Sequence, residues 1–247
     1  MAAARKARLG ARRLVSRRKP PDTGDRRNEP VADWLVWQLM DSAFPTGGFA
    51  HSQGLEAAWQ HGEVRNRIEL VSFAETGMHQ LGHSAQPLVM AAFDEPKRLP
   101  EFDHLCEVFT TNHVTNRASR AQGRAFLTAV ERIFAHNTRC LPDALTAPCA
   151  HFAPVFGACL RHLGIPRRTA SRMFFCNYLR SVLAAAVRLN IVGPMEAQIL
   201  QQRLAGQAEE ILIRCESLSL ADLTQTSPLL DLWQGAQDRL YSRLFQS

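Results

Sequence analysis

The chain has 247 residues, of which 46% are hydrophobic, so it is long enough to bury one large core or two modest ones. Its formal charge of +6 is concentrated at one end. Residues 1–30 carry ten Lys or Arg and three acidic residues, whereas the rest of the chain carries 19 Lys or Arg and 20 acidic residues. A nearly neutral body argues against a nucleic-acid-binding domain, which would carry a basic surface on its folded part.

Residues 1–30 show no apolar periodicity and contain two proline-rich stretches. We predict a disordered basic extension here, followed by a folded domain over residues 31–247. The absence of acidic residues before Asp22 is also typical of a mitochondrial targeting segment or a nuclear import patch. Only one hydroxyl residue, Ser16, lies in that stretch, which disfavours a transit peptide.

The body is predicted to be a series of helices, because alternating apolar and polar residues of the strand type are almost absent. Asp33 is placed to cap a first helix, and Ser52 to begin a second that ends near Gly62. Further helical patterns follow Pro148 and cover residues 68–93, 104–136, 166–190 and 194–215. The sequence therefore predicts an all-α, single-domain bundle of about eight to ten helices.

Polar stretches that contain proline interrupt these patterns, and we predict loops at residues 94–100, 137–148 and 217–228. No run of 18 uncharged apolar residues occurs, which argues against a membrane span. The six cysteines lack CxxC spacing and no secretory signal is evident, so we interpret them as reduced thiols of a cytoplasmic protein.

The segment at residues 44–56, FPTGGFAHSQGLE, places three glycines and a proline between two helical patterns. Glycine allows backbone conformations that other residues avoid and permits close approach, so this loop has a special geometry or a partner that touches its backbone. No Lys follows the glycines and no strand precedes them, which disfavours a phosphate-binding loop. His51 and Ser52 are adjacent and do not face each other as base and nucleophile, which disfavours a Ser/His hydrolase.

The C-terminal segment at residues 229–247 is rich in apolar residues for a chain end. Its large side chains are Leu232, Trp233, Leu240, Tyr241, Leu244 and Phe245. Such a segment either docks onto its own body or binds another protein and folds as it binds.

Two pairs of residues are candidate metal ligands. His79 and His83 lie one turn apart, with Glu75 one turn earlier, and two imidazoles with a carboxylate suit Zn²⁺ or Ni²⁺. The same stripe is typical of a solvated helix face. Cys149 and His151 form a second pair, but two donors do not complete a closed site, so the sequence favours a buried pair with satisfied hydrogen bonds over a tight metal site.

Two groups of polar residues are candidate contact sites on helices. Arg117, Arg120 and Arg124 share a basic face near Gln122, which is either a partner surface or, more commonly, a solvated face. Asn177 and Arg180 lie in an apolar helix, where they are either satisfied inside the bundle or exposed at an oligomer interface.

Four separated blocks resemble the urease accessory protein UreF family, especially its plant and other eukaryotic members. Residues 34–56 are similar to the family's signature P-x-G-[GS]-[FY]-x-[HY]-S-x-G-L-E. The other blocks, in the family's order, are residues 117–126, then 151–157 with 177–181 and 187–190, and finally 240–247. Residues 1–30 lie outside the resemblance.

The resemblance implies a non-enzymatic, all-α, dimeric protein. Proteins of this family bind the accessory protein UreD, also called UreH, and with it recruit the GTPase UreG to deliver nickel to apo-urease. Nickel is then the cargo of the complex and this chain needs no cofactor of its own. Because the family's C-terminal tail packs into UreD/UreH, the resemblance favours partner binding by residues 229–247. It also assigns the glycine-rich loop to partner contact or to shaping the path of nickel.

We expect the partner-facing residues to be Pro45, Gly47, Gly48, Phe49, His51, Ser52, Gly54, Glu56, Arg120, Gln122, Arg180, Leu240, Tyr241, Ser242, Arg243, Leu244 and Phe245. No nucleic acid or membrane is expected as a partner. The alternative is a metallochaperone that itself holds nickel through His79 and His83 or through Cys149 and His151.

Overall fold

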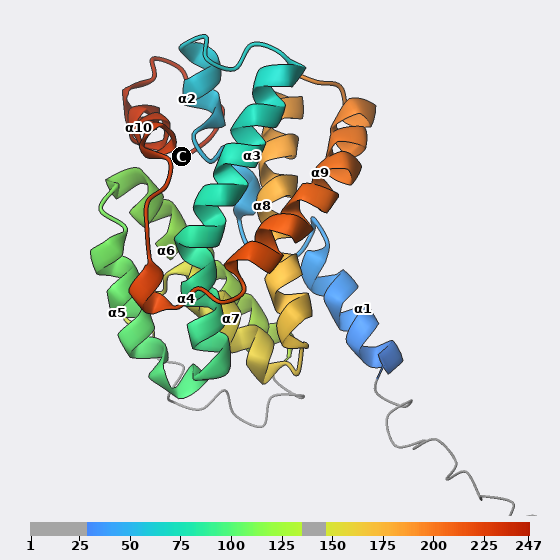
Figure 1. Cartoon of the computed structure of the whole chain (residues 1–247), viewed down its shortest axis with the longest axis vertical. Helices are drawn as coiled ribbons and strands as arrows, with labels where there is room; N and C mark the ends of the chain where they lie inside the picture. The colour runs from blue at the N-terminus through green and yellow to red at the C-terminus, as the bar shows by residue number, and fades with distance from the viewer. Residues whose placement is uncertain (1–28, 135–146) are drawn as a thin grey trace, which may run out of the picture.

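The computed structural model describes residues 29–134 and 147–247, and every regular element in these ranges is helical (Figure 1). The ten α-helices are α1 Glu29–Met40, α2 Leu55–Gln60, α3 Arg67–His83, α4 Ala85–Asp94, α5 Leu99–Phe109, α6 His113–Ile133, α7 Phe152–His162, α8 Arg167–Arg188, α9 Pro194–Cys215 and α10 Pro228–Ala236. The predicted all-α bundle is confirmed. The predictions for residues 1–28, and for most of the loop at 137–148, lie outside the described residues.

The first helix, α1, begins earlier than the sequence suggested. It starts at Glu29, so Asp33 lies inside the helix and the predicted cap at Asp33 was wrong. The predicted domain boundary at residue 31 stays a prediction. Pro30 fits there because the first helical turn has no use for its missing N–H group. The second helix, α2, begins at Leu55 after Gly54 and not at Ser52.

Two patterns that each predicted one long helix are two helices in the structure. The first pattern breaks at Ser84, between α3 and α4, because Pro87 has no N–H to donate to the carbonyl of residue 83 and lies in the first turn of α4. The second breaks between α5 and α6, where the Asn112 side chain accepts hydrogen bonds from the N–H groups of Val114 and Thr115.

The core is centred on α7, whose residues 152–160 are all buried among α4, α5, α6 and α8. Phe126, Phe152, Phe156 and Phe174 form a ring cluster there, with centroids of neighbouring rings 5.3–6.1 Å apart. Gly157 allows α7 to approach α4 closely, because a Cβ atom at this position would lie 2.0 Å from a carbonyl oxygen of α4. Packing of one apolar helix on all sides explains why the chain folds as a single unit.

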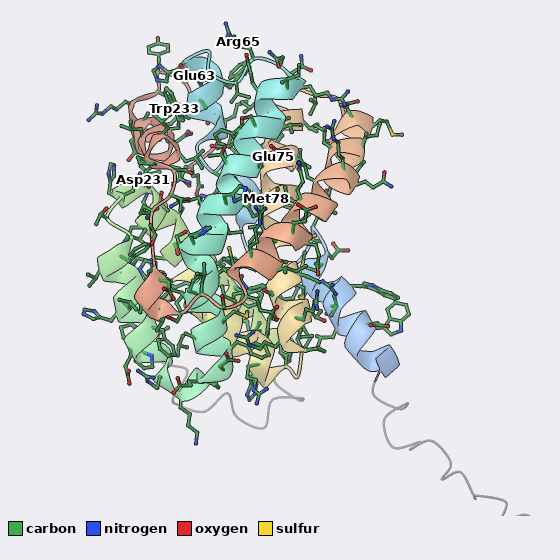
Figure 2. The ribbon with its side chains drawn as sticks, viewed as in Figure 1. Glu63, Arg65, Glu75, Met78, Asp231 and Trp233 are labelled. Atoms are coloured by element: carbon green, nitrogen blue, oxygen red, sulfur yellow. The ribbon has the colours of Figure 1, made fainter. Side chains whose placement is uncertain are left out.

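The opposite end of the bundle joins segments that are far apart in sequence. Helix α10 packs against α2 and α6, and the chain end lies beside both α10 and α2 in Figure 1. Trp233 projects from α10, as Figure 2 shows, and its ring centroid lies 5.4 Å from that of His61. This arrangement places the glycine-rich loop next to the C-terminal tail.

The five cysteines in the described ranges are free thiols. None of the helices in these ranges is long and apolar enough to cross a lipid bilayer.

Candidate functional site

The glycine-rich loop uses its glycines for backbone geometry. Gly47 and Gly54 have φ angles of 69° and 84°, in the left-handed region that glycine adopts without strain. Gln53 adopts φ 58° without being glycine, which costs about 1 kcal/mol of backbone strain. At Gly54 space is also short, because a Cβ atom would lie 3.0 Å from the backbone nitrogen of Gln234. The loop is therefore shaped to receive α10.

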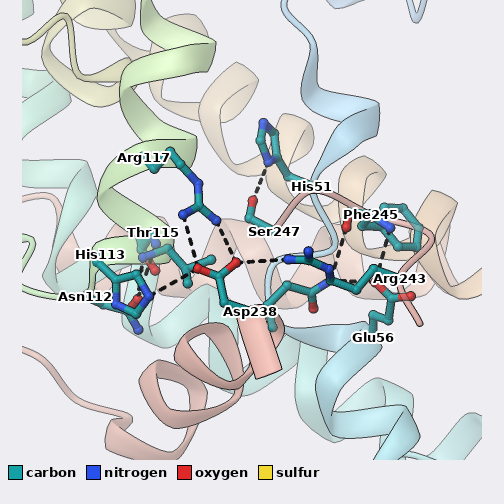
Figure 3. Close-up of polar contacts among 12 residues, drawn as sticks. His51, Glu56, Asn112, His113, Thr115, Arg117, Asp238, Arg243, Phe245 and Ser247 are labelled. Atoms are coloured by element: carbon teal, nitrogen blue, oxygen red, sulfur yellow. Dashed lines mark hydrogen bonds and ion pairs between the residues drawn. The ribbon is translucent and has the colours of Figure 1, made fainter. Parts of the chain in front are cut away.

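The C-terminal tail, residues 240–247, lies along this loop and is hydrogen-bonded to its backbone. The Ser52 N–H donates to the Ser247 carbonyl oxygen at 2.5 Å, and the Gln246 N–H donates to the Ala50 carbonyl oxygen at 2.7 Å. The side chains of His51 and Ser247 are also hydrogen-bonded. The glycine-rich loop, residues 44–56, and the tail, residues 240–247, thus form one structure, which we call the loop–tail junction (Figure 3).

Glu56 is the polar centre of the loop–tail junction, and its side chain is buried. Its carboxylate accepts hydrogen bonds from the N–H groups of Leu244 at 2.6 Å and Phe245 at 3.2 Å, and from the Gln237 side-chain amide at 2.6 Å. A buried carboxylate is tolerated where several donors satisfy it. The first turn of α2 therefore holds the tail in place.

Arg188, at the end of α8, joins the loop to the tail from the other side. Its guanidinium donates to the carbonyl oxygens of Phe49 at 2.8 Å and Leu244 at 3.1 Å. The same group lies 4.2 Å from the centroid of the buried Phe245 ring, within the range of a cation–π interaction. Phe245 is consequently packed against its own chain.

A charged cluster surrounds Asp238, just before the tail. Arg117 donates two hydrogen bonds to this carboxylate at 2.8 and 3.1 Å, Arg243 lies 3.1 Å away, and His113 lies 3.2 Å away. The hydrogen bond from Arg117 is the main cause that lowers the pKa of Asp238. Figure 3 shows how this cluster links α6 to the tail.

His51 is the titratable group at the centre of the loop. Burial, with a smaller contribution from Arg117, lowers the pKa of His51 to about 4. The imidazole is therefore neutral near pH 7.

The loop–tail junction exposes apolar side chains on an ordered backbone. Tyr241 is fully exposed, and Leu244 and Phe49 keep 58% and 48% of their accessible area. Leu244 and Phe49 are bridged through their carbonyl oxygens by Arg188, so they lie on the same part of the surface. An exposed apolar group of this kind is typical of a protein–protein contact site.

The predicted partner-facing residues do not all lie on this surface. Ser52 and Glu56 are buried, and Glu56 is occupied by the tail. Gln122 is buried. Arg180 donates hydrogen bonds to the Met40 carbonyl oxygen and, at 3.0 Å, to the Asn177 side chain. This agrees with the interpretation that Asn177 and Arg180 are satisfied within the bundle. Contact of these residues with a partner stays a prediction.

A pocket of about 190 Å³ that is partly open to solvent lies next to the loop–tail junction. His51 and Ser247 line it on the junction side, and residues of α3 to α8 and α10 line much of the rest, among them Gln80, Gln122 and Asn177. Its lining is mostly apolar, with a few amide and hydroxyl groups.

The two predicted metal-ligand pairs differ in the structure. The Nδ1 atom of His83 lies 2.9 Å from the His79 carbonyl oxygen. Among the described residues, His79 and His83 do not belong to any group of three possible metal ligands. Cys149 and His151, in contrast, lie with Glu107 so that one ligand atom from each falls within 4.8 Å of the others. Sequence reasoning missed Glu107 because it lies more than 40 residues earlier, on α5.

Sequence reasoning also missed Arg188, Gln237 and Asp238, which hold the tail. Arg188 lies within one of the matched blocks, and that was a usable signal. Gln237 and Asp238 carried no signal, because their role depends on how α10 and the tail fold back onto α2 and α6.

Comparison with known protein families gives a match to the family described as UreF over residues 26–205. Urease accessory protein F of Oryza sativa subsp. japonica is 38% identical over 220 residues, covering 86% of this chain and 84% of the rice protein. Urease accessory protein F of Arabidopsis thaliana is 39% identical over 231 residues, covering 90% and 95%. A UreF-like urease accessory protein of Schizosaccharomyces pombe is 29% identical over 225 residues, covering 85% and 94%.

Proposed function

The chain belongs to the UreF family of urease accessory proteins, and from this premise we propose that it is a non-catalytic scaffold in urease maturation. In this proposal it binds UreD/UreH, and the pair recruits the GTPase UreG to deliver nickel to apo-urease. The chain works as a homodimer in the cytoplasm, and the scaffold role needs no cofactor of its own. The family resemblance supports the partners, the homodimer and the absence of a cofactor, and the cysteines without CxxC spacing support the cytoplasmic location.

One observation supports the scaffold role most directly, namely the exposed apolar surface on the loop–tail junction. Tyr241 and Leu244 project from a tail whose backbone is already fixed by Glu56 and Arg188. Binding through such a tail loses less conformational entropy than binding through an unstructured segment. Burial of one large apolar side chain contributes about 1.5–3 kcal/mol.

The test is co-purification of the tagged chain with UreD/UreH, UreG and apo-urease, comparing wild type with Tyr241→Asp. Because the Tyr241 side chain is fully exposed, the substitution leaves the fold intact while placing a charge where an apolar ring would dock. We expect the affinity for UreD/UreH to fall at least about tenfold, with loss of UreG and urease from the complex. Light scattering on the purified chain and complex measures the dimer.

Met195→Asp is the matched control, because Met195 is an exposed apolar residue in the first turn of α9. Figure 1 shows α9 on the opposite side of the bundle from the marked chain end. It should bind as wild type does. Equal binding of wild type and Tyr241→Asp would refute a role of the exposed tail surface. Failure of the wild-type chain to capture any of the three proteins would refute the scaffold itself.

A further inference from the structure

A second site lies at the junction of α5, α6 and the start of α7. Its three donors are the Glu107 carboxylate, the Cys149 thiol and the His151 imidazole, whose ligand atoms lie within 4.8 Å of one another. His151 is buried, whereas Glu107 and Cys149 are partly exposed, so the group is open to solvent on one side. Nitrogen, sulfur and oxygen donors in this combination are those of zinc sites.

The backbone that carries Cys149 and His151 is held in one conformation. The buried Asp103 carboxylate accepts hydrogen bonds from three consecutive N–H groups, those of Cys149, Ala150 and His151, at 2.7, 3.0 and 2.7 Å. Ala150 has φ 59°, which is strained for alanine. Gly123 of α6 lets this turn approach, because a Cβ atom there would lie 1.9 Å from the Ala150 carbonyl oxygen. The donors are thus positioned before any ligand arrives.

Both ring nitrogens of His151 have a hydrogen-bond partner. Its Nδ1 lies 3.1 Å from the Ser119 hydroxyl, which also accepts from the Phe152 N–H at 3.1 Å. Its Nε2 lies 2.7 Å from Glu107. A hydrogen bond at one ring nitrogen commonly orients a histidine so that the other nitrogen can bind a metal. A divalent ion would take the place of the proton between His151 and Glu107.

The charges around the three donors are mixed. Burial is the largest cause that raises the pKa of Cys149, and the nearby Asp103 and Glu107 carboxylates raise it further. The hydrogen bond from His151 lowers the pKa of Glu107. Arg120 lies 3.7 Å from Glu107 and opposes binding of a cation. A bound ion would deprotonate the thiol, and the resulting thiolate and carboxylate would balance its two positive charges.

We propose that Glu107, Cys149 and His151 form a binding site for a divalent ion of the Zn²⁺ type, with water completing the coordination. Three protein ligands and one open position are the usual arrangement of accessible zinc sites. The site lies apart from the loop–tail junction, and the proposal does not depend on the scaffold function.

The test uses the untagged, reduced full-length chain titrated with Co²⁺, a spectroscopic substitute for Zn²⁺. We expect one Co²⁺ per chain, a thiolate-to-cobalt charge-transfer band in the near ultraviolet, and loss of the band when Zn²⁺ is added. Absence of the band in the wild-type chain, or its persistence in excess Zn²⁺, would overturn the proposal.

Variants show where the ion binds. Cys149→Ala should abolish the band, whereas Cys176→Ala, a matched change at another partly exposed cysteine, and the double variant His79→Ala/His83→Ala should retain it. Glu107→Gln should weaken binding about tenfold or more. Arg120→Gln should tighten binding because it removes the opposing charge. A band that survives in Cys149→Ala, or an affinity unaffected by both Glu107→Gln and Arg120→Gln, would place the ion elsewhere and refute the site.

Discussion

At the residue scale, the most consequential side chain is Glu56, because one buried carboxylate satisfies three donors from the tail and from the residue after α10. The signature motif places this glutamate directly after Gly54 and Leu55. Its position in the first turn of α2 explains how a local sequence motif can control a segment almost 190 residues later.

We expect Glu56→Gln to lower the free energy of unfolding by about 2 kcal/mol. Hydrogen bonds to a charged group contribute about 1.5–3 kcal/mol. The glutamine amide has lost the charge, and its N–H groups would face the N–H groups that Glu56 accepts from. Urea denaturation measures the loss, and faster amide exchange at Leu244 and Phe245 would locate it. Glu63→Gln, at an exposed residue just beyond α2, is the control. Equal stability of the two variants would show that Glu56 does not hold the tail.

His51 predicts a pH dependence of stability. The pKa of His51 is about 4 in the folded chain against 6.5 as its ordinary value, so between these pH values the unfolded chain binds more protons. The contribution of neutral His51 to the free energy of unfolding is fully present above pH 6.5. It is lost as the pH falls towards 4, by up to about 3 kcal/mol.

The measurement is the free energy of unfolding of wild type and His51→Asn between pH 7 and 4. Asparagine keeps a polar group near Nδ1 but does not titrate, so the slope of the variant should be smaller over this window. Parallel curves for the two proteins would mean that His51 is not the group responsible.

At the scale of elements, the loop and α10 fit together because of a missing side chain. Gly54 and Gly62 both have positive φ angles, but only Gly54 lies against α10, whereas the space around Gly62 is open. A substitution at Gly62 therefore measures the cost of backbone strain alone, whereas one at Gly54 measures strain and close packing together.

We expect Gly62→Ala to lower the free energy of unfolding by about 1 kcal/mol, the cost of alanine at positive φ. Gly54→Ala should cost about 2–4 kcal/mol, because overpacking against α10 adds to that strain. Thermal or urea unfolding of both variants provides the comparison. Equal losses would contradict the close contact between the loop and α10.

At the scale of the whole molecule, apolar periodicity was enough to predict the helical class and most of the helix positions. It joined α3 to α4 and α5 to α6, because short interruptions at Ser84 and Asn112 do not disturb an apolar pattern. The match to known families confirmed the resemblance that the separated blocks had suggested.

The candidate sites were less predictable, because they depend on contacts between distant segments. The loop and the tail were each recognised, but nothing in either segment showed that they bind each other through Glu56 and Arg188. Phe245 was expected to bury itself in a partner, whereas its ring is buried in its own chain. Glu107 joins Cys149 and His151 only through the packing of α5 beside α7.

The span of the Glu56 contact has a consequence for the order in which the protein is made. Residues 56 and 244 are separated by 188 positions, so Glu56 leaves the ribosome long before its acceptor role can be fulfilled. At about 5–20 residues per second, translation of the intervening chain takes roughly 10–40 s. During that interval the glycine-rich loop is without its tail, and factors that bind nascent chains have access to a surface that the finished protein covers.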